Sequence, residues 1–309
     1  MIFRKNIVSV VGVVSALALL PVLAGCSDQS NDAGGECGSN SVTVVSTIYN
    51  WDVLVGEINA PCVQHSSILE AGGDPHEFEP SAADIEKVKA ADLVIVNGME
   101  IDEWAAKAVD TANQKVITAI DFVGDNPNQN PHAWFSFDAI KQVTQAVSNS
   151  LTELYGTKSI TATVDLAAVN AKIEPVDAEI NSAARDSSVS CAYTENLLEF
   201  LLRNTNCADG TPQGYKLAAQ NESEPTAQDV DAFLTLLDQK KLALLVNNNT
   251  EASPVTEKLV AAAETAGIPV LNVTETIPDN FTSLIDWWKS IYDEVVQLTS
   301  TNESSTSSQ

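Results

Sequence analysis

Histidine and positive charge are scarce in this sequence. Three histidines occur among 309 residues, and 16 lysines and arginines stand against 42 aspartates and glutamates, which gives a formal net charge of −26. A surface this acidic repels nucleic acid and is not drawn to an anionic membrane by charge, so both are excluded as electrostatic partners. Its attraction for cations is weak and does not by itself identify a cation-binding protein.

Long apolar runs are absent after the first 25 residues. No later segment approaches the ~18 apolar residues that are needed to cross a bilayer. Arg4 and Lys5, followed by the uncharged and mostly apolar run 7–23, predict a secretory signal peptide over residues 1–25. Its removal leaves 14 positive against 42 negative side chains, a charge of about −28.

A cysteine follows the signal peptide directly. Leu23-Ala24-Gly25-Cys26 resembles a bacterial lipobox, in which the cysteine is lipidated and becomes the new N-terminus. The alternative is a plain signal peptide followed by a chance cysteine. With a lipobox, residues 26–40 form a lipidated flexible tether, since they are rich in serine, aspartate, asparagine and glycine. The protein is then exported and anchored by lipid at the extracellular face of the cell membrane.

Paired C-x₂-C motifs are also absent, which excludes a zinc ribbon. The four remaining cysteines are Cys37, Cys62, Cys191 and Cys207. An even number in an exported protein indicates disulfides, and three pairings are possible. Sequence order favours Cys37–Cys62 and Cys191–Cys207, one in each half of the chain. No thiolate is then left to bind a metal.

The chain lacks the common hydrolase and nucleotide-binding motifs. It contains no H-E-x-x-H, no G-x-S-x-G and no P-loop. These absences argue against an enzyme and against an ATPase, so any ATPase that the function requires is a separate protein.

Short apolar runs that alternate with helical segments predict an α/β fold. Runs of this kind, bounded by turn residues, are typical of parallel strands buried on both faces. Ser81 with Asp84 forms a capping box for a helix through Ala90, and Ser253-Pro254 begins a second helix that ends at Gly267. The predicted strands are Thr43–Ile48, Val63–Leu69, Leu93–Val96, Lys115–Ile120, Val189–Tyr193, Leu242–Val246 and Pro269–Val273.

The strands fall into two groups, which predicts an N-terminal α/β lobe at 41–160 and a C-terminal α/β lobe at 187–298. Between them, apolar residues recur at intervals of three and four from Leu166 to Ile180, which predicts a linking helix within 161–186. A continuous helix from Thr161 to Arg185 spans about 37 Å, kinked at Pro175. Two short helices that meet at this proline are the alternative.

The end of the chain changes character at residue 299. An apolar stripe of helical spacing runs from Leu284 to Leu298 and predicts an amphipathic C-terminal helix. Residues 299–309 are rich in serine and threonine and have no apolar content, so they are expected to be a disordered tail.

Two of the three histidines follow a proline, in Asp74-Pro75-His76 and Asn130-Pro131-His132. Proline restricts its own backbone and that of the preceding residue, so each imidazole is carried by a stiff turn. Neutral imidazole is the commonest metal ligand in proteins. His65 has no such context and is expected to be structural or exposed. Asp74 and the nearby Glu77 and Glu79 either support a ligand from behind or are simply solvated, and solvated side chains are the favoured expectation.

Four metal-capable side chains follow predicted strands, two from each half. His76 and His132 come after strands of the first half, and Glu195 and Glu275 each come two residues after a strand of the second half. Ligands of open α/β sheets bind beyond the carboxyl ends of the strands. Singly, each has an ordinary explanation, a surface histidine or a carboxylate at a helix N-terminus. Their joint placement predicts a metal in a cleft between two lobes.

Two imidazoles with two carboxylates suit Zn²⁺ or Mn²⁺, with Fe²⁺ as a third choice. Carboxylate oxygens favour the harder Mn²⁺, whereas most such sites bind Zn²⁺ more tightly. Binding requires neutral imidazoles and is therefore expected to weaken below about pH 6.

From about Val42 to Leu298 the chain resembles the solute-binding lipoproteins of zinc and manganese ABC importers. The most specific matching segments are Gly73-Asp74-Pro75-His76-Glu77-Phe78-Glu79-Pro80, Ala91-Asp92-Leu93-Val94-Ile95-Val96-Asn97-Gly98 and Asn130-Pro131-His132-Ala133-Trp134. The resemblance implies two α/β lobes joined by one long spine helix, with metal held between them.

The resemblance also implies the ligand order. The first two family ligands match His76 and His132, and the third, a histidine in many zinc binders and a glutamate in typical manganese binders, matches Glu195. The fourth family ligand is usually aspartate, whereas this chain has Glu275. The histidine-rich loop of many zinc members is absent, because residues 121–131 contain no histidine.

The function expected from these features is capture of a divalent transition metal and its delivery to an ABC permease, which works with an ATPase. The protein is expected to be a monomer and not an enzyme. Two alternatives are a surface adhesin whose metal is structural and a secreted metallohydrolase, which requires an open coordination position and a general base.

Overall fold

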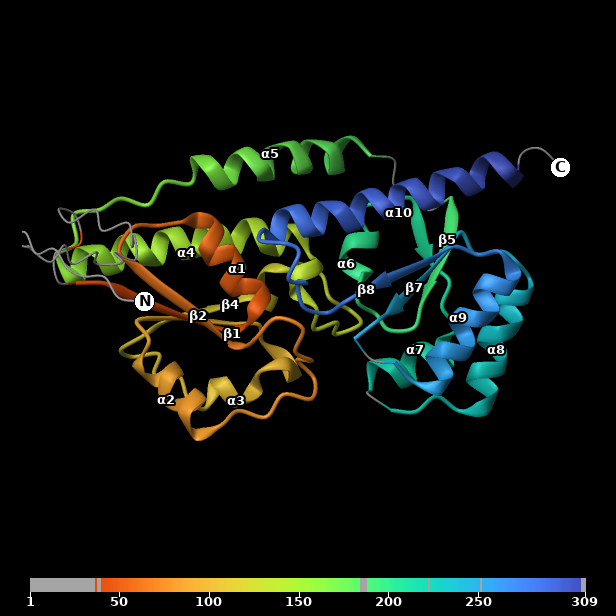
Figure 1. Ribbon diagram of the computed structural model, residues 1–309, viewed down its shortest axis with the longest axis horizontal. Helices are drawn as coiled ribbons and strands as arrows, with labels where there is room; N and C mark the ends of the chain where they lie inside the picture. Colours follow the sequence, from red (N-terminus) through yellow and green to blue (C-terminus); the bar gives the residue numbers. More distant parts are fainter. Residues whose placement is uncertain (1–36, 38–39, 184–187, 222, 251, 307–309) are drawn as a thin grey trace, which may run out of the picture. The chain divides into compact units, whose positions relative to one another are not determined.

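Each half of the protein has one parallel β-sheet at its centre, and the two sheets have the same strand order (Figure 1). The computed structural model describes residues 37, 40–183, 188–221, 223–250 and 252–306. The first sheet has the order β2-β1-β3-β4 and the second the order β6-β5-β7-β8, with every neighbouring pair parallel. The predicted α/β fold with two parallel sheets is therefore confirmed. The strands are β1 Val42–Ile48, β2 Val63–Leu69, β3 Leu93–Val96, β4 Lys115–Thr118, β5 Val189–Tyr193, β6 Cys207–Asp209, β7 Leu244–Asn248 and β8 Val270–Val273.

Both faces of each sheet are buried, as continuous apolar strands require. In β1, Val44 packs in the largest core and Val45 in a smaller core on the other face, because successive side chains point to opposite sides. In β7, Val246 and Leu245 divide in the same way.

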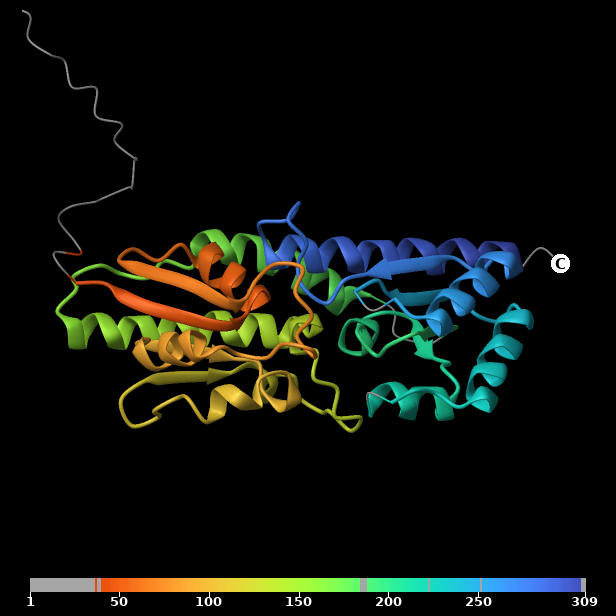
Figure 2. The same ribbon diagram turned by 60° about the horizontal axis from the view of Figure 1, so that its bottom comes forward.

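Helices cover these faces and fix where the loops emerge. In the first half, α2 and α3 pack on the smaller core that contains Val45, whereas α1 and α4 pack on the largest core (Figure 1). In the second half, α8 and α9 cover the outer face of the sheet, and α10 runs along the other face, as Figure 2 shows. The helices are α1 Tyr49–Ile58, α2 Ala82–Ala90, α3 Glu103–Ala106, α4 Phe137–Lys158, α5 Ala167–Ser182, α6 Glu199–Leu202, α7 Gln213–Gln220, α8 Ala227–Asp238, α9 Pro254–Ala266 and α10 Leu284–Thr306, with 3₁₀ turns at Met99–Ile101, Ala119–Phe122 and Ala133–Phe135.

Both predicted helix starts are confirmed. Ser81 and Asp84 form a reciprocal capping box at the start of α2. Ser253 caps α9 through the backbone N–H of Thr256, and the helix ends at Gly267 in a left-handed conformation with φ 75°.

The linking helix α5 is shorter than the predicted segment from Thr161 to Arg185. It starts only at Ala167, whose N–H donates a hydrogen bond to Asp165 Oδ1 at 2.8 Å. The residues before it include three β-branched side chains, which have low helix propensity, and Ile160 is buried in an extended stretch. Pro175 lies inside α5, so one continuous helix is confirmed over two short ones.

The prediction of a disordered tail from residue 299 is wrong for residues 299–306, because α10 continues to Thr306. Thr299 is 1% exposed, and its hydroxyl donates to the Val295 carbonyl at 2.8 Å, so this threonine belongs to the packed face of the helix.

The predicted signal peptide 1–25, the lipidation site Cys26 and most of the tether lie outside the described residues. Within the described part of the chain, every helix is too short or too polar to cross a membrane.

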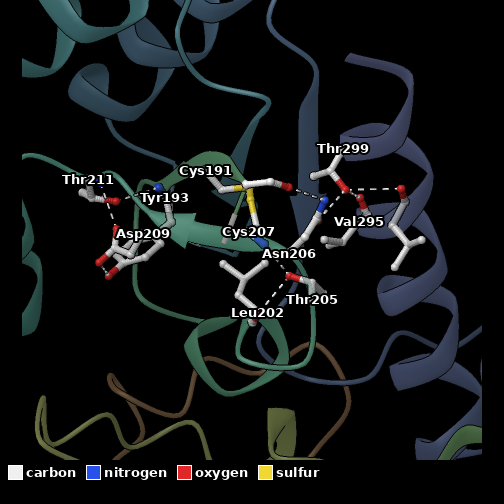
Figure 3. The surroundings of a disulfide bond; sticks show 12 residues. Cys191, Tyr193, Leu202, Thr205, Asn206, Cys207, Asp209, Thr211, Val295 and Thr299 are labelled. Carbon is white, nitrogen blue, oxygen red and sulfur yellow. Dashed lines mark hydrogen bonds between the residues drawn. A yellow bond between two sulfur atoms is a disulfide. The ribbon is translucent and has the colours of Figure 1, made fainter. Parts of the chain in front are cut away.

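Two disulfides join cysteines in the pairing that sequence order favours. Cys37 bonds to Cys62, which precedes β2, and Cys191 of β5 bonds to Cys207 of β6. Figure 3 shows the second bond between neighbouring strands, with Thr299 of α10 close to Asn206. This bond fixes the edge strand β6 to β5, the strand that leads to Glu195.

The largest hydrophobic core belongs to both halves of the chain. It includes Val44 of β1 and Val246 of β7, and tryptophans of α1, the 133–135 turn and α10 are fully buried in it. The indole N–H of Trp288 in α10 donates to the Phe135 carbonyl at 2.9 Å. The C-terminal helix therefore packs directly beneath the segment that carries His132.

Candidate metal site

His76 lies in the loop between β2 and α2, and Asp74 shapes its turn. Asp74 Oδ1 accepts hydrogen bonds from the backbone N–H of His76 at 2.8 Å and of Glu77 at 3.3 Å. Asp74 is therefore part of the turn, whereas the sequence predicted a solvated side chain. The turn is an aspartate-stabilised one, which sets the direction of the imidazole.

His132 is 2% exposed and is oriented by Asn130. Asn130 Oδ1 accepts from the backbone N–H of His132 and from its ring Nδ1, both at 2.9 Å. With Nδ1 as the donor, the lone pair of Nε2 faces away from Asn130 and is available to a metal. The Asn130 amide in turn donates to the Asn196 carbonyl of the second half at 2.7 Å, so the support for this histidine crosses between the halves.

Glu195 meets both histidines. Its Oε1 lies 3.3 Å from His132 Nε2 and 3.7 Å from His76 Nε2, and the two Nε2 atoms are 3.3 Å apart. Among the described residues, these three form the one group of histidine, cysteine or carboxylate side chains compact enough to share a metal ion.

Glu275 lies beside this group of three side chains but does not belong to it. Its Oε2 lies 3.6 Å from His76 Nε2, and the residue is fully buried. This oxygen has no hydrogen-bond partner among the described residues. A buried carboxylate oxygen without a partner is costly, and a cation in the neighbouring group would satisfy it.

The loop that carries Glu275 is tied to the first half of the protein. Asn50, at the start of α1, donates to the Glu275 carbonyl and accepts from the Ile277 N–H, both at 3.0 Å. The hydroxyl of Thr276 accepts from the Gly72 N–H at 3.0 Å, in the loop that leads to His76. Loops from opposite halves therefore hold each other in place.

The two carboxyl groups are driven to different protonation states. Burial, followed by the nearby charge of Glu195, raises the pKa of Glu275 to about 8. Burial also acts to raise the pKa of Glu195, but the hydrogen bond and charge of His132, with the charge of His76, outweigh it and the pKa falls below its usual value. At neutral pH Glu195 is therefore ionised and Glu275 is mostly protonated.

Asn248, the last residue of β7, lies between the two glutamates. Its side-chain amide donates to Glu195 Oε2 and, at 2.7 Å, to Glu275 Oε1.

A cavity of about 390 Å³ opens beside the candidate site and is lined in part by His76, His132, Glu195 and Asn248. The side chain of Glu195 is 18% exposed and that of Glu275 is fully buried, so the cavity approaches the site from the side of Glu195.

His65 lies apart from this group, as expected. Its Nδ1 is 2.9 Å from Asp52 Oδ1, and its side chain is 36% exposed. The hydrogen bond to Asp52 raises the pKa of His65 above its usual value.

The sequence did not identify the uncharged residues that support the site. Asn50, Asn130, Asn248 and Thr276 supply hydrogen bonds, and a search for charged or imidazole ligands passes over them. Asn248 carries a usable signal, because it follows a buried apolar run and so lies at the carboxyl end of a parallel strand, where open α/β sheets bind ligands.

The two α/β halves share a core and bring imidazole and carboxylate side chains together at facing strand ends. This arrangement is typical of two-lobed solute-binding proteins with a site suited to a metal ion. The sequence profile of the family described as zinc-uptake complex component A, periplasmic, matches residues 44–298, and the chain belongs to this family.

Named relatives agree with this assignment. The metal ABC transporter substrate-binding lipoprotein FimA of Streptococcus parasanguinis is 25% identical over 309 aligned residues, which cover 92% of this chain and 96% of that protein. The iron ABC transporter substrate-binding lipoprotein MtsA of Streptococcus pyogenes is 23% identical, covering 81% of this chain and 87% of that one. Among solved structures, the periplasmic zinc-binding protein TroA of Treponema pallidum has a TM-score of 0.64 at 19% identity, over 84% of this chain and 99% of the other, and shares the fold.

Proposed function

We propose that this protein captures a divalent transition metal outside the cell and delivers it to an ABC permease driven by a separate ATPase. In this proposal His76, His132, Glu195 and Glu275 hold the ion. The observation that carries it is the buried Glu275 Oε2, which lacks a partner among the described residues and lies 3.6 Å from a histidine nitrogen of a compact ligand group.

The spacing of the ligand atoms supports Zn²⁺ as the preferred cargo. The three separations within the group are 3.3, 3.3 and 3.7 Å. Ligands about 2.1 Å from a tetrahedral zinc stand about 3.4 Å apart, whereas adjacent ligands of an octahedral ion at the same bond length stand about 3.0 Å apart. Mn²⁺ is then the weaker cargo, consistent with its lower affinity than Zn²⁺ for such ligands, and Fe²⁺ is the third choice.

The charge of the ligand set also fits a divalent cargo. Two neutral imidazoles and two carboxylates balance one divalent ion, so the buried complex is neutral overall. Loss of the Glu275 proton on binding makes this balance possible, since burial raises the pKa of this carboxyl to about 8. Because Glu275 must lose its proton when the metal binds, protonation of this carboxyl also favours release of the metal.

The same geometry supports a binding protein over the metallohydrolase alternative. A catalytic zinc site keeps one position open for water and places a general base beside it. Here four donor side chains converge, and the carboxylate best placed to act as a base is itself a proposed ligand. No feature of the described residues favours the adhesin alternative over transport.

The proposal extends to the cellular context. The chain is exported, lipidated at Cys26 and held at the extracellular face of the membrane by residues 26–40, with lobes at 41–160 and 187–298 that act as a monomer. Support comes from the signal and lipobox pattern and from the relatives that are named as lipoproteins of ABC transporters.

Metal binding by three single variants tests the ligand assignment. His76→Ala and His132→Ala are expected to lower the affinity for Zn²⁺ by at least a hundredfold, since each removes a ligand. His65→Ala is the matched control and keeps the affinity, because His65 pairs with Asp52 on the surface. Elemental analysis of the purified proteins, followed by competition between Zn²⁺ and Mn²⁺, measures both stoichiometry and preference. Equal affinity in all three variants would show that the histidines are not ligands.

A further inference from the structure

We propose that Asn248 is a specificity-determining residue of the metal site. By holding one oxygen of Glu195 and one of Glu275, it restricts each carboxylate to a single bond with the ion and so favours four-coordinate Zn²⁺ over six-coordinate ions. The inference rests on the proposed function, because it concerns how the same site distinguishes between divalent metals.

Sheet topology places Asn248 between the two glutamates. In the order β6-β5-β7-β8, strand β7 lies between β5 and β8. Glu195 follows the end of β5 at Tyr193, Glu275 follows the end of β8 at Val273, and Asn248 is the last residue of β7. The three side chains therefore emerge side by side at the carboxyl edge of one sheet.

The orientation of the Asn248 amide is fixed by its surroundings. Its Oδ1 accepts from the Thr250 N–H at 2.8 Å, and its own backbone N–H donates to Thr194 Oγ1 at 2.9 Å. With the oxygen occupied in this way, the NH₂ group faces the carboxylates, where it donates to Glu195 Oε2 and to Glu275 Oε1. Asn248 is 2% exposed, so water has little access to compete for these bonds.

These bonds divide the oxygens of each carboxylate into two roles. The oxygen bound by Asn248 faces the sheet, and the other faces a histidine. Glu195 Oε1 lies 3.3 Å from His132 Nε2, and Glu275 Oε2 lies 3.6 Å from His76 Nε2. To bind a metal through both oxygens, either glutamate must turn the oxygen held by the amide toward the histidines. This rotation weakens or breaks a hydrogen bond from a buried donor.

Denticity decides which metals fit the site. Zn²⁺ is satisfied by four ligands in a tetrahedron, the number supplied when His76, His132 and two singly bound glutamates coordinate. Ions that prefer six ligands gain from carboxylates that bind through both oxygens. Without the Asn248 amide, the same four side chains offer up to six donor atoms, and the site becomes more suitable for Mn²⁺.

A simpler role for Asn248 makes a different prediction. If the amide only reduces the repulsion between two buried carboxylates, its loss weakens every divalent metal alike. The ratio of Zn²⁺ to Mn²⁺ affinity and the number of metal ligands would then stay the same. Selectivity and coordination number therefore distinguish a specificity role from general support.

The experiment compares the full-length protein with Asn248→Ala and with Asn248→Leu, which keeps a similar volume but has no donor. Asn247→Ala is the matched control, because this neighbouring amide on β7 bonds to Thr194 and Asn272 and to neither glutamate. Affinities for Zn²⁺ and Mn²⁺ are measured by competition with a chromophoric chelator. X-ray absorption of the zinc-loaded and manganese-loaded proteins gives the number of nitrogen and oxygen ligands.

Both Asn248 variants are expected to lower the ratio of Zn²⁺ to Mn²⁺ affinity about tenfold or more, the size of effect that supporting residues have on metal sites. The ligand number of the bound Mn²⁺ is expected to rise relative to the unsubstituted protein, and Asn247→Ala is expected to change neither quantity. An unchanged ratio in the Asn248 variants, or an equal change in the control, overturns the role of Asn248 but leaves the proposed function in place. Failure of the unsubstituted protein to bind either metal overturns both.

Discussion

Uncharged amides direct three of the four candidate ligands of this site, whereas a carboxylate, Asp74, sets the turn of His76. Asn130 sets the ring of His132, Asn248 contacts both glutamates, and Asn50 holds the loop of Glu275. An amide can donate and accept at once and carries no charge that would compete for the metal. These three candidate ligands are thus preorganised without adding charge to a buried site.

The protonation of Glu275 gives a prediction about the metal-free protein. Because burial raises the pKa of Glu275 from its usual value of 4.5 to about 8, the folded protein retains a proton there that the unfolded chain loses. This contribution to stability is complete below about pH 4.5 and is lost as the pH rises through about 8. Glu275→Gln, which cannot ionise, is expected to gain at least about 1 kcal/mol relative to the unsubstituted protein between pH 5 and pH 8, roughly 2–4 °C in melting temperature.

Thermal unfolding in the presence of a chelator measures this difference. Burial also raises the pKa of Asp102, but this residue is the same in both proteins and cancels in the comparison. Parallel curves of melting temperature against pH for the two proteins would contradict the prediction.

At this scale the sequence predicts which residues converge but not how they are held. His76, His132, Glu195 and Glu275 are recognisable because each follows a strand and each has a side chain that binds metals. Asn130 was visible beside His132 but had no assignable role, because its contact with Asn196 joins residues 66 positions apart. Hydrogen bonds over such separations depend on how the halves pack, which local patterns do not encode.

Among the elements, three helices meet at Glu57 of α1. This carboxylate accepts from the hydroxyl of Ser283 and, at 2.8 Å, from the Leu284 N–H at the start of α10. Lys172 of α5 lies 3.2 Å from the same side chain, which is 6% exposed. A carboxylate from one helix therefore satisfies the N-terminus of another, where the helix dipole also favours negative charge.

Glu57→Ala is expected to lower the free energy of unfolding by about 1.5–3 kcal/mol, because it removes charge-assisted hydrogen bonds from a buried helix end. Denaturant titration measures the change. Glu153→Ala is the control, because Glu153 pairs with Lys115 at the surface, where both side chains are exposed. The control is expected to change stability by less than about 1 kcal/mol. Equal effects of the two substitutions would show that the Glu57 contacts contribute no more than a surface ion pair.

Elements with strong local signals were the ones that the sequence predicted well. β2, β3 and β5 match their expected bounds, whereas β4 ends at Thr118 because the chain then turns into a 3₁₀ segment at Ala119–Phe122. β6 has three residues and owes its position to its pairing with β5, so no apolar run marks it. α4 lacks a capping box, since Ser136 is followed three residues later by Ala139, and this helix was not identified from its start.

For the molecule as a whole, the shared core joins what the sequence presents as two lobes. Residues of both sheets, together with α1, α4, α5 and α10, contribute to one continuous cluster of buried side chains. The metal-free protein is therefore expected to unfold in one cooperative transition, with a calorimetric enthalpy close to the van't Hoff enthalpy. Two separate transitions in scanning calorimetry, one for each sheet, would refute this expectation.

The sequence patterns predict the two sheets but not the core that they share. That core depends on α10, which is far in sequence from the segment around Phe135 on which it packs.

The loop that carries Glu275 has a consequence for how such sites diversify. Asn50 grips this loop through the carbonyl of residue 275 and the N–H of Ile277, and the backbone N–H of residue 275 donates to the Thr250 hydroxyl at 3.0 Å. All three bonds use main-chain atoms of this loop, so every amino acid at position 275 except proline would leave them in place. The backbone of this loop is thus held independently of the side chain at position 275. If Glu275 is the fourth ligand, as proposed, one substitution there is expected to alter the metal preference without rebuilding the loop.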